Sequence, residues 1–116
     1  MTVQLIEQAA LPGGEFEGYL FGATVSVIFE RAVREGGGPR LHRHPYDETF
    51  IVYSGAATFT VGAEQVLVRA GQVLVAPALV PHRFATIGDY AAHHIHANDR
   101  FVTEWLEDPR DLPTAT

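Results

Sequence analysis

Cysteine and lysine are both absent from this chain of 116 residues. The absence of cysteine excludes disulfide frameworks, thiolate zinc sites, iron–sulfur clusters and cysteine nucleophiles. Its eight basic residues are all arginine, so Schiff-base lysines, pyridoxal phosphate anchors and Walker-type phosphate lysines are excluded as well. Composition alone therefore removes several large classes of enzyme.

Positive charge and long apolar runs are also scarce. The formal net charge is -6 at pH 7, whereas proteins that bind nucleic acid or anionic membranes carry clusters of lysine and arginine. No apolar run approaches the length that crosses a membrane, and residues 1–10 lack the basic start of a signal peptide. We therefore expect a cytoplasmic protein with no nucleic-acid partner and no membrane partner.

The composition that remains is typical of one globular domain. Hydrophobic residues make up 47% of the chain and charged residues 19%, a balance that disordered chains do not have. A chain of this length buries enough apolar surface to fold without a structural metal ion. A bound metal would therefore serve function rather than stability.

Apolar residues recur at every second position in short runs separated by glycine and proline, which indicates an all-β fold. The expected strands cover residues 3–6, 19–21, 24–31, 41–44, 49–53, 57–61, 65–68, 73–76, 82–86 and 90–96. So many short strands favour a sandwich or a barrel. Behind Asn98 and Asp99, apolar residues at helical spacing over 101–106 predict a short C-terminal helix.

Four residues offer the ligand types of a metal site, namely His42, His44, Glu48 and His82. Two positions apart on a strand, His42 and His44 point to the same face. Glu48 follows a turn-like stretch that would return a second strand beside the first, and His82 opens a later strand. Three imidazoles and one carboxylate suit a divalent transition metal. A histidine pair alone also fits a half-exposed polar sheet face, so the spacing around it has to decide.

That spacing is specific. The first motif of the cupin family, G(x)5HxH(x)3-4E(x)6G, is matched at every fixed position by Gly36, His42, His44, Glu48 and Gly55. Over about residues 18–96 the chain thus resembles a small single-domain cupin.

The second cupin motif, G(x)5PxG(x)2H(x)3N, is matched in part. Gly71, Pro77 and His82 stand at the correct spacing, but Leu79 replaces the second glycine and Thr86 replaces the asparagine. Both departures concern turn shape and a polar partner rather than a metal ligand. The ligand set of the motif is therefore complete.

The resemblance implies an all-β double-stranded β-helix, a jelly-roll barrel with the metal inside. It makes His42, His44, Glu48 and His82 the expected ligands of one divalent ion, which could be iron, manganese, nickel or zinc. It also implies a homodimer, with which the apolar residues 3–6 are compatible. The single domain over 1–116 would comprise an N-terminal arm over about 1–17, the barrel over about 18–97, and the helix and tail over 98–116.

Strand alternation gives candidates for a substrate pocket around the metal. These are Arg40, Tyr46, Phe50, Val52, Phe84, His94 and His96. Arg40 could hold a substrate carboxylate or form a rim salt bridge, and Phe50, Val52 and Phe84 would either shape a cavity or fill the barrel. His94 and His96 would be a base near the metal or polar residues of an edge strand. Glu15 and Glu30 do not form a pair of carboxylates at a spacing that suggests general acid–base catalysis, and they are interpreted as surface residues.

Cupins include dioxygenases, decarboxylases, isomerases, hydrolases and binders without activity, so the fold alone does not decide the function. We favour a metalloenzyme that acts on a small organic molecule, with oxidation by dioxygen ahead of isomerase or lyase chemistry. The alternatives are a binding module without turnover and a barrel that the metal merely stiffens. The sequence assigns no catalytic residue.

Overall fold

The structure is a computed structural model that describes residues 3–108 and is built almost wholly from strands. In chain order its elements are η1 (Gln8–Ala10), η2 (Pro12–Gly14), β1 (Glu15–Phe16), η3 (Gly18–Phe21), β2 (Ser26–Ala32), β3 (His42–Arg43), β4 (Glu48–Val61), β5 (Glu64–Arg69), β6 (Val73–Ala76), β7 (His82–His96) and β8 (Glu104–Trp105). The longest helical element within this range has 4 residues. No helix there is long and apolar enough to span a membrane.

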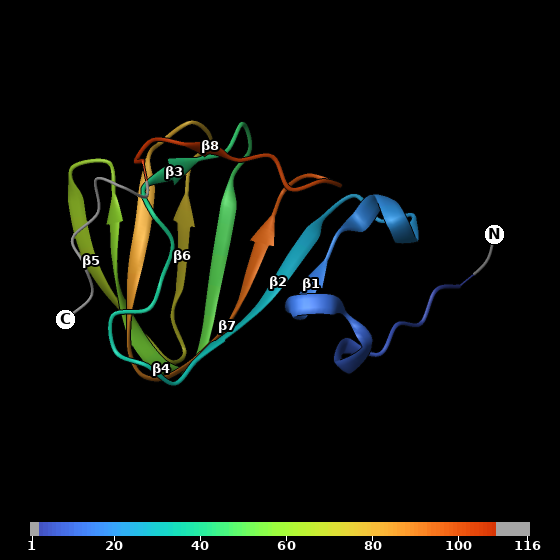
Figure 1. Ribbon diagram of the computed structural model, residues 1–116, viewed down its shortest axis with the longest axis horizontal. Coiled ribbons are helices and arrows are strands. Elements are labelled where there is room, and N and C mark those ends of the chain that lie inside the picture. The colour runs from blue at the N-terminus through green and yellow to red at the C-terminus, as the bar shows by residue number, and fades with distance from the viewer. Residues whose placement is uncertain (1–2, 109–116) are drawn as a thin grey trace.

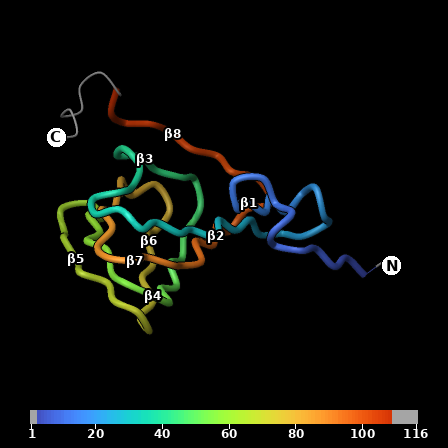
Figure 2. Tube along the Cα trace, turned by 60° about the horizontal axis from the view of Figure 1, so that its bottom comes forward, coloured from blue at the N-terminus to red at the C-terminus, as the bar shows by residue number. Residues whose placement is uncertain are grey.

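The strands form one strongly curled antiparallel sheet around a common interior (Figures 1 and 2). Its order is β1-β2-β7-β3-β8, and β4 pairs with β5, β6 and β7. The long strands β4 and β7 run side by side and contribute to both ends of the barrel. This arrangement confirms the all-β double-stranded β-helix.

Two of the long strands were each expected as a pair of shorter ones. Residues 49–53 and 57–61 both belong to β4, and residues 82–86 and 90–96 both belong to β7. The break in β4 is a bulge, because Val52 pairs with Ala92 whereas Ser54 pairs with Ala91. Gly55 has a φ of 64° there, and a Cβ on it would lie 2.7 Å from the carbonyl oxygen of Asp89. The glycine therefore bends a continuous strand instead of closing a turn.

The expected C-terminal helix is wrong. Residues 104 and 105 form β8, which pairs with β3, and the Arg43 guanidinium donates to the Glu104 carboxylate at 2.7 Å. The Leu106 amide donates to the Leu41 carbonyl at 3.0 Å. The pairing with β3 and the Leu106 bond satisfy backbone groups that a helix would have paired internally. Residues 109–116 of the expected tail lie outside the described part of the chain.

Two expected strands near the N-terminus are also not formed. Residues 3–6 do not belong to any strand, and residues 19–21 belong to η3. The N-terminal segment extends to one side of the barrel (Figures 1 and 2). The barrel itself therefore begins with β1 and β2.

The hydrophobic core fills the barrel directly beside the histidines. Its buried side chains are Phe50, Val52, Ala57, Phe59, Val68, Ala76, Phe84, Tyr90 and Ala92. The ring of Phe50 lies 4.7 Å from that of Phe59 and 4.7 Å from that of His94, measured between centroids. Packing in the core thus supports the walls of the histidine cluster.

Leu79 occupies a backbone conformation that suits glycine. Its φ is 67°, and it is the one non-glycine residue with positive φ in the described chain. The motif glycines Gly36, Gly55 and Gly71 also have positive φ. The Leu79 amide donates to the carbonyl of His44 at 2.8 Å, so this turn is joined to an expected ligand. Left-handed backbone costs an L residue about 1–2 kcal/mol.

We expect Leu79→Gly to raise the free energy of unfolding by about 0.5–1 kcal/mol, after allowing for the extra freedom of glycine in the unfolded chain. The side chain is 59% exposed, so little buried surface is lost. Urea unfolding measures the change. Leu79→Ala keeps the Cβ and should gain nothing, and a less stable glycine variant would contradict this account of the turn.

Candidate metal centre

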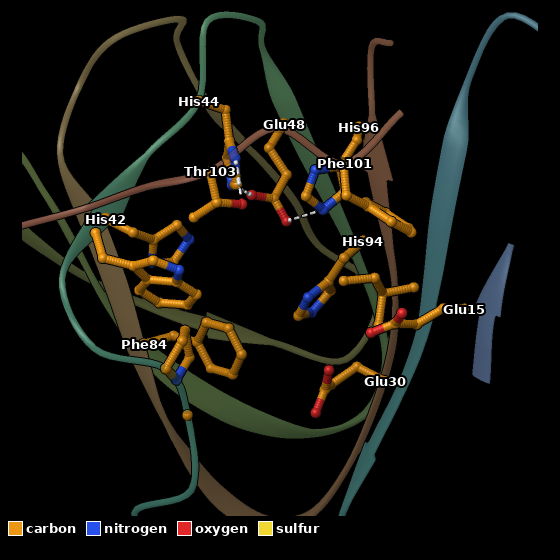
Figure 3. Close-up of a pocket in the computed structure, with 14 residues that line it drawn as sticks. Glu15, Glu30, His42, His44, Glu48, Phe84, His94, His96, Phe101 and Thr103 are labelled. Atoms are coloured by element: carbon orange, nitrogen blue, oxygen red, sulfur yellow. Dashed lines mark hydrogen bonds and ion pairs between the residues drawn. The ribbon is translucent and has the colours of Figure 1, made fainter. Parts of the chain in front are cut away.

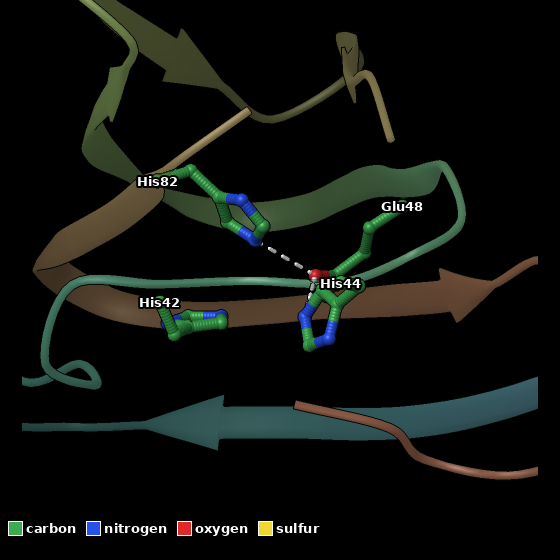
Figure 4. A group of neighbouring side chains, drawn as sticks. All are labelled: His42, His44, Glu48 and His82. Carbon is green, nitrogen blue, oxygen red and sulfur yellow. Dashed lines mark hydrogen bonds and ion pairs between the residues drawn. The ribbon is translucent and has the colours of Figure 1, made fainter. Parts of the chain in front are cut away.

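His42, His44, Glu48 and His82 converge inside the barrel (Figure 4). One nitrogen or oxygen atom from each lies within 4.8 Å of the corresponding atoms of the others, and all four side chains are buried. Sheet pairing explains part of this, because His42 of β3 stands opposite His82 of β7. The turn over residues 45–47 leads into Glu48, the first residue of β4. The four residues of the cupin motifs therefore form one group that could hold a metal ion.

Backbone carbonyls orient the three imidazoles. In each ring Nδ1 lies against a carbonyl oxygen, so Nδ1 carries a hydrogen and Nε2 is the nitrogen left to bind a metal. The carbonyl partners of His42, His44 and His82 are, in that order, Arg40 at 2.7 Å, Val102 at 2.8 Å and Val80 at 3.0 Å. Burial lowers the pKa of His42 to about 4, although the Arg40 carbonyl opposes the shift. Neutral imidazoles with inward lone pairs are the form that binds metals.

Glu48 supplies the negative charge of the group. Its Oε1 lies 3.0 Å from Nε2 of His44 and 3.0 Å from Nε2 of His82. Burial alone would raise the pKa of Glu48, but its contacts with the histidines outweigh burial and hold the pKa well below its usual range. The buried Nε2 of His44 completes no hydrogen bond despite this close approach. An unpartnered imidazole nitrogen beside an ionised carboxylate fits a divalent transition metal.

A cavity of about 480 Å³ opens beside the group (Figure 3). It is lined by Glu15, Ile28, Glu30, Gly38, Pro39, His42, His44, Glu48, Phe84, His94, His96, Phe101, Thr103 and Trp105. The carboxylates of Glu15 and Glu30 lie at the end of the cavity away from Glu48. Burial, and then Glu15 and Glu48, raise the pKa of Glu30. The cavity therefore joins a histidine-rich end to an acidic end.

The remaining pocket candidates fall into three places. Phe84, His94 and His96 line the cavity. Phe50 and Val52 lie in the core. The Arg40 guanidinium stacks over Trp105 at 4.5 Å from the ring centroid, while Tyr46 is buried and hydrogen-bonded to His96 at 2.7 Å.

Sequence reasoning missed several wall residues. Glu30 was expected at the surface and Trp105 on a helix, yet Glu30 is half-buried and both line the cavity. Glu15 is exposed, as expected, and also lines the cavity. The β2–β7 register places Ile28 opposite His94, and Glu30 shares the face of Ile28 because it is two residues further along β2. Alternation along β2 could have identified Glu30 once its partner strand was known.

The metal-free protein is expected to lose stability in mild acid because of His94. Burial lowers the pKa of His94 to about 4, from an ordinary value of 6.5. Between these values the unfolded chain binds a proton that the folded chain does not, so stability falls as pH falls from 6.5 towards 4. His94 alone should cost about 2 kcal/mol at pH 5 relative to pH 7.5, and His42 acts in the same direction.

Urea unfolding of metal-free protein at both pH values measures this loss. His94→Phe removes the titrating group, so its stability should change less between pH 7.5 and pH 5 than that of the parent protein. Equal pH dependence of the two proteins would contradict the contribution of a buried neutral His94.

Two curated relatives are similar in sequence. Protein SchB of Streptomyces halstedii is 41% identical over 73 residues, which cover 61% of this chain and 52% of that protein. Polyketide synthase CurC of Streptomyces cyaneus is 31% identical over 100 residues, covering 82% of this chain and 65% of that protein. The chain thus spans between half and two thirds of the length of these relatives.

Solved structures show the same fold at low identity. Oxalate decarboxylase of Lactobacillus farciminis aligns with a TM-score of 0.70 at 22% identity, covering 79% of this chain and 30% of that one. Salicylate 1,2-dioxygenase of Pseudaminobacter salicylatoxidans aligns with a TM-score of 0.59 at 20% identity, covering 64% and 21%. The family model described as "Cupin domain" matches residues 29–102. This match spans more than half of the sequence, and the chain therefore belongs to the cupin family.

Proposed function

We propose that this cupin is a metalloenzyme that acts on a small, oxygen-bearing organic molecule. The observation that carries the proposal is the group of His42, His44, Glu48 and His82, which lines one end of a cavity large enough for such a molecule. Oxidation by dioxygen is the favoured reaction, and isomerase or lyase chemistry is the alternative enzymatic reaction. The ion would be iron, manganese, nickel or zinc, one per chain.

The chain's own residues prepare the site for this chemistry. A divalent metal held by the four residues would polarise an oxygen-bearing substrate, and a redox-active one would also support oxidation by dioxygen. The backbone carbonyls of Arg40, Val80 and Val102 hold the imidazoles in one orientation. The rings of Phe84 and Phe101 line the cavity and would give a bound substrate apolar contacts.

The charge of the cavity favours a substrate without a carboxylate. Glu15 and Glu30 line it, and none of its described lining residues is an arginine. The Arg40 guanidinium stacks over the wall residue Trp105 and is not itself among the lining residues. The name of the relative CurC, a polyketide synthase, supports a ketone- or hydroxyl-bearing substrate. We therefore propose an uncharged phenol or diketone.

Oxygen consumption tests the proposal. Protein reconstituted with ferrous ion is mixed with phenolic, diketone and thiol compounds in an oxygen electrode. Uptake that requires both the metal and one of these compounds is the expected result. The His42→Ala, His82→Ala double variant serves as the control without a complete ligand set. Binding of a compound with no oxygen uptake and no other turnover would reject the enzyme and favour a binding module.

A binding module without turnover is the second candidate, because the buried ligand group and the cavity beside it could also hold a molecule that is not converted. The two candidates differ in turnover. Titration calorimetry of the metal-loaded protein with a compound that binds, followed by product analysis, distinguishes binding from reaction.

We also propose that the protein is a cytoplasmic homodimer. Val3 and Leu5 are each 90% exposed, in an N-terminal segment that extends beside the barrel (Figure 2). Burying two such side chains against a second copy would contribute about 3–6 kcal/mol. Light scattering should give twice the monomer mass for the parent protein and the monomer mass for a Val3→Asp, Leu5→Asp variant. A monomeric parent protein would contradict the proposal.

A further inference from the structure

His96 lies beside the candidate metal centre but outside its group of four. It ends β7 opposite Glu48 in the β4–β7 pairing, and both side chains are buried. Its Nε2 lies 3.1 Å from Oε2 of Glu48, an ion-pair distance at which the buried nitrogen completes no hydrogen bond. Oε1 of Glu48 instead faces His44 and His82. The two oxygens of one carboxylate thus have different neighbours (Figure 3). One oxygen faces the ligand group and the other faces His96.

The hydrogen-bond partners of Tyr46 indicate which nitrogen of His96 carries the hydrogen. The amide of Val102 can only donate, and it donates to the Tyr46 hydroxyl at 3.2 Å. The same hydroxyl lies 2.7 Å from Nδ1 of His96 and has no other hydrogen-bond partner in residues 3–108. The phenolic hydrogen is therefore donated to Nδ1, which leaves the ring hydrogen of His96 on Nε2. That hydrogen is on the nitrogen nearest Glu48.

This tautomer is the reverse of the one in the candidate ligands. His42, His44 and His82 place Nδ1 against backbone carbonyls and turn Nε2 inward. His96 instead has an acceptor at Nδ1 and an N–H at Nε2. An imidazole N–H cannot ligate a metal, but it attracts a carboxylate oxygen.

We propose that Tyr46 and His96 are positioning residues that hold Oε2 of Glu48 and so direct Oε1 towards the ligand group. The proposal rests on the metal site in the proposed function, but not on any reaction there. Outer partners of this kind set the orientation of a ligand and typically change metal affinity by about 10–100-fold when removed. Tyr46 acts on Glu48 only through the tautomer of His96.

Tyr46→Phe tests this series of contacts from Tyr46 through His96 to Glu48, because the substitution removes one hydroxyl and keeps the ring. We expect cobalt(II) affinity to fall about 10–100-fold and the visible cobalt spectrum to change. His96→Gln retains an amide donor and should bind cobalt more tightly than His96→Leu. Tyr53→Phe is a matched control, because Tyr53 makes a similar contact with Nδ1 of His93 at 3.1 Å on the exposed face. It should leave cobalt binding unchanged.

A measurement on the metal-free protein makes the test independent of metal binding. Nitrogen-15 shifts of the imidazoles should show hydrogen on Nε2 in His96 and on Nδ1 in His42, His44 and His82. In Tyr46→Phe the His96 pattern should lose its preference for Nε2. Hydrogen on Nδ1 of His96 in the parent protein, or parental cobalt affinity in Tyr46→Phe, would overturn the proposal. Failure to oxidise any substrate would reject only the proposed function.

Discussion

A double variant, His42→Ala with His82→Ala, is expected to lose metal uptake while keeping a folded, β-rich domain. Two of the three inward Nε2 atoms disappear, and Glu48 loses one of its imidazole contacts. The loss of affinity should exceed about a hundredfold, the upper range for removing an outer partner, because ligand atoms themselves are removed. Elemental analysis after dialysis measures metal content, and circular dichroism measures the fold.

The matched control is His93→Ala, on the same strand as His82 but on the opposite face from His94. His93 contacts Tyr53 at the exposed side of the sheet, so its removal should leave metal content unchanged. Normal metal content in the double variant would disprove the ligand assignment. Loss of metal in His93→Ala alone would show that uptake does not depend on the buried group.

Phe50→Ala should have the largest effect on stability, about 3–5 kcal/mol, the range for deleting a buried phenylalanine. Phe50 is fully buried, and its ring packs against Phe59, Phe84 and His94. A domain of this size is typically stable by about 5–15 kcal/mol, so the variant loses a large share of that margin. Urea unfolding measures the loss.

Val73→Ala provides the comparison, because Val73 is 61% exposed on β6. It should cost less than about 1 kcal/mol. This pair also tests whether Phe50 fills the barrel or shapes the cavity, the two roles that the sequence left open. A small stability loss in Phe50→Ala, together with altered ligand binding, would contradict the filling role.

The motif residues made the barrel and the candidate ligands predictable, whereas the periphery was not. The residue spacing around His42 and His82 can be read directly from the sequence. The resemblance to the cupin family that this spacing supports then implied the topology of the barrel. The segment 101–106 shows apolar spacing that fits a helix, but it forms an edge strand. It pairs with β3, where Arg43 stands opposite Glu104 at a separation of 61 residues, so no local pattern reveals the pairing.

The cavity was only partly predictable for a related reason. The alternation of side chains along a strand predicts that His94 and His96 share one face of β7, but it does not predict which residues each of them contacts. Register decides this, because His96 stands opposite Glu48 and His94 opposite Phe50. His96 therefore contacts the carboxylate of the ligand group. His94 packs against an aromatic ring, and its Nε2 is hydrogen-bonded to the Tyr90 hydroxyl at 2.8 Å.

The central claim is that His42, His44, Glu48 and His82 form a site for one transition-metal ion. The most direct test is elemental analysis of protein purified without a chelator or an affinity tag, repeated after reconstitution with ferrous ion. The account predicts close to one iron, manganese, nickel or zinc ion per chain. A protein that retains no metal, even after reconstitution, would contradict it.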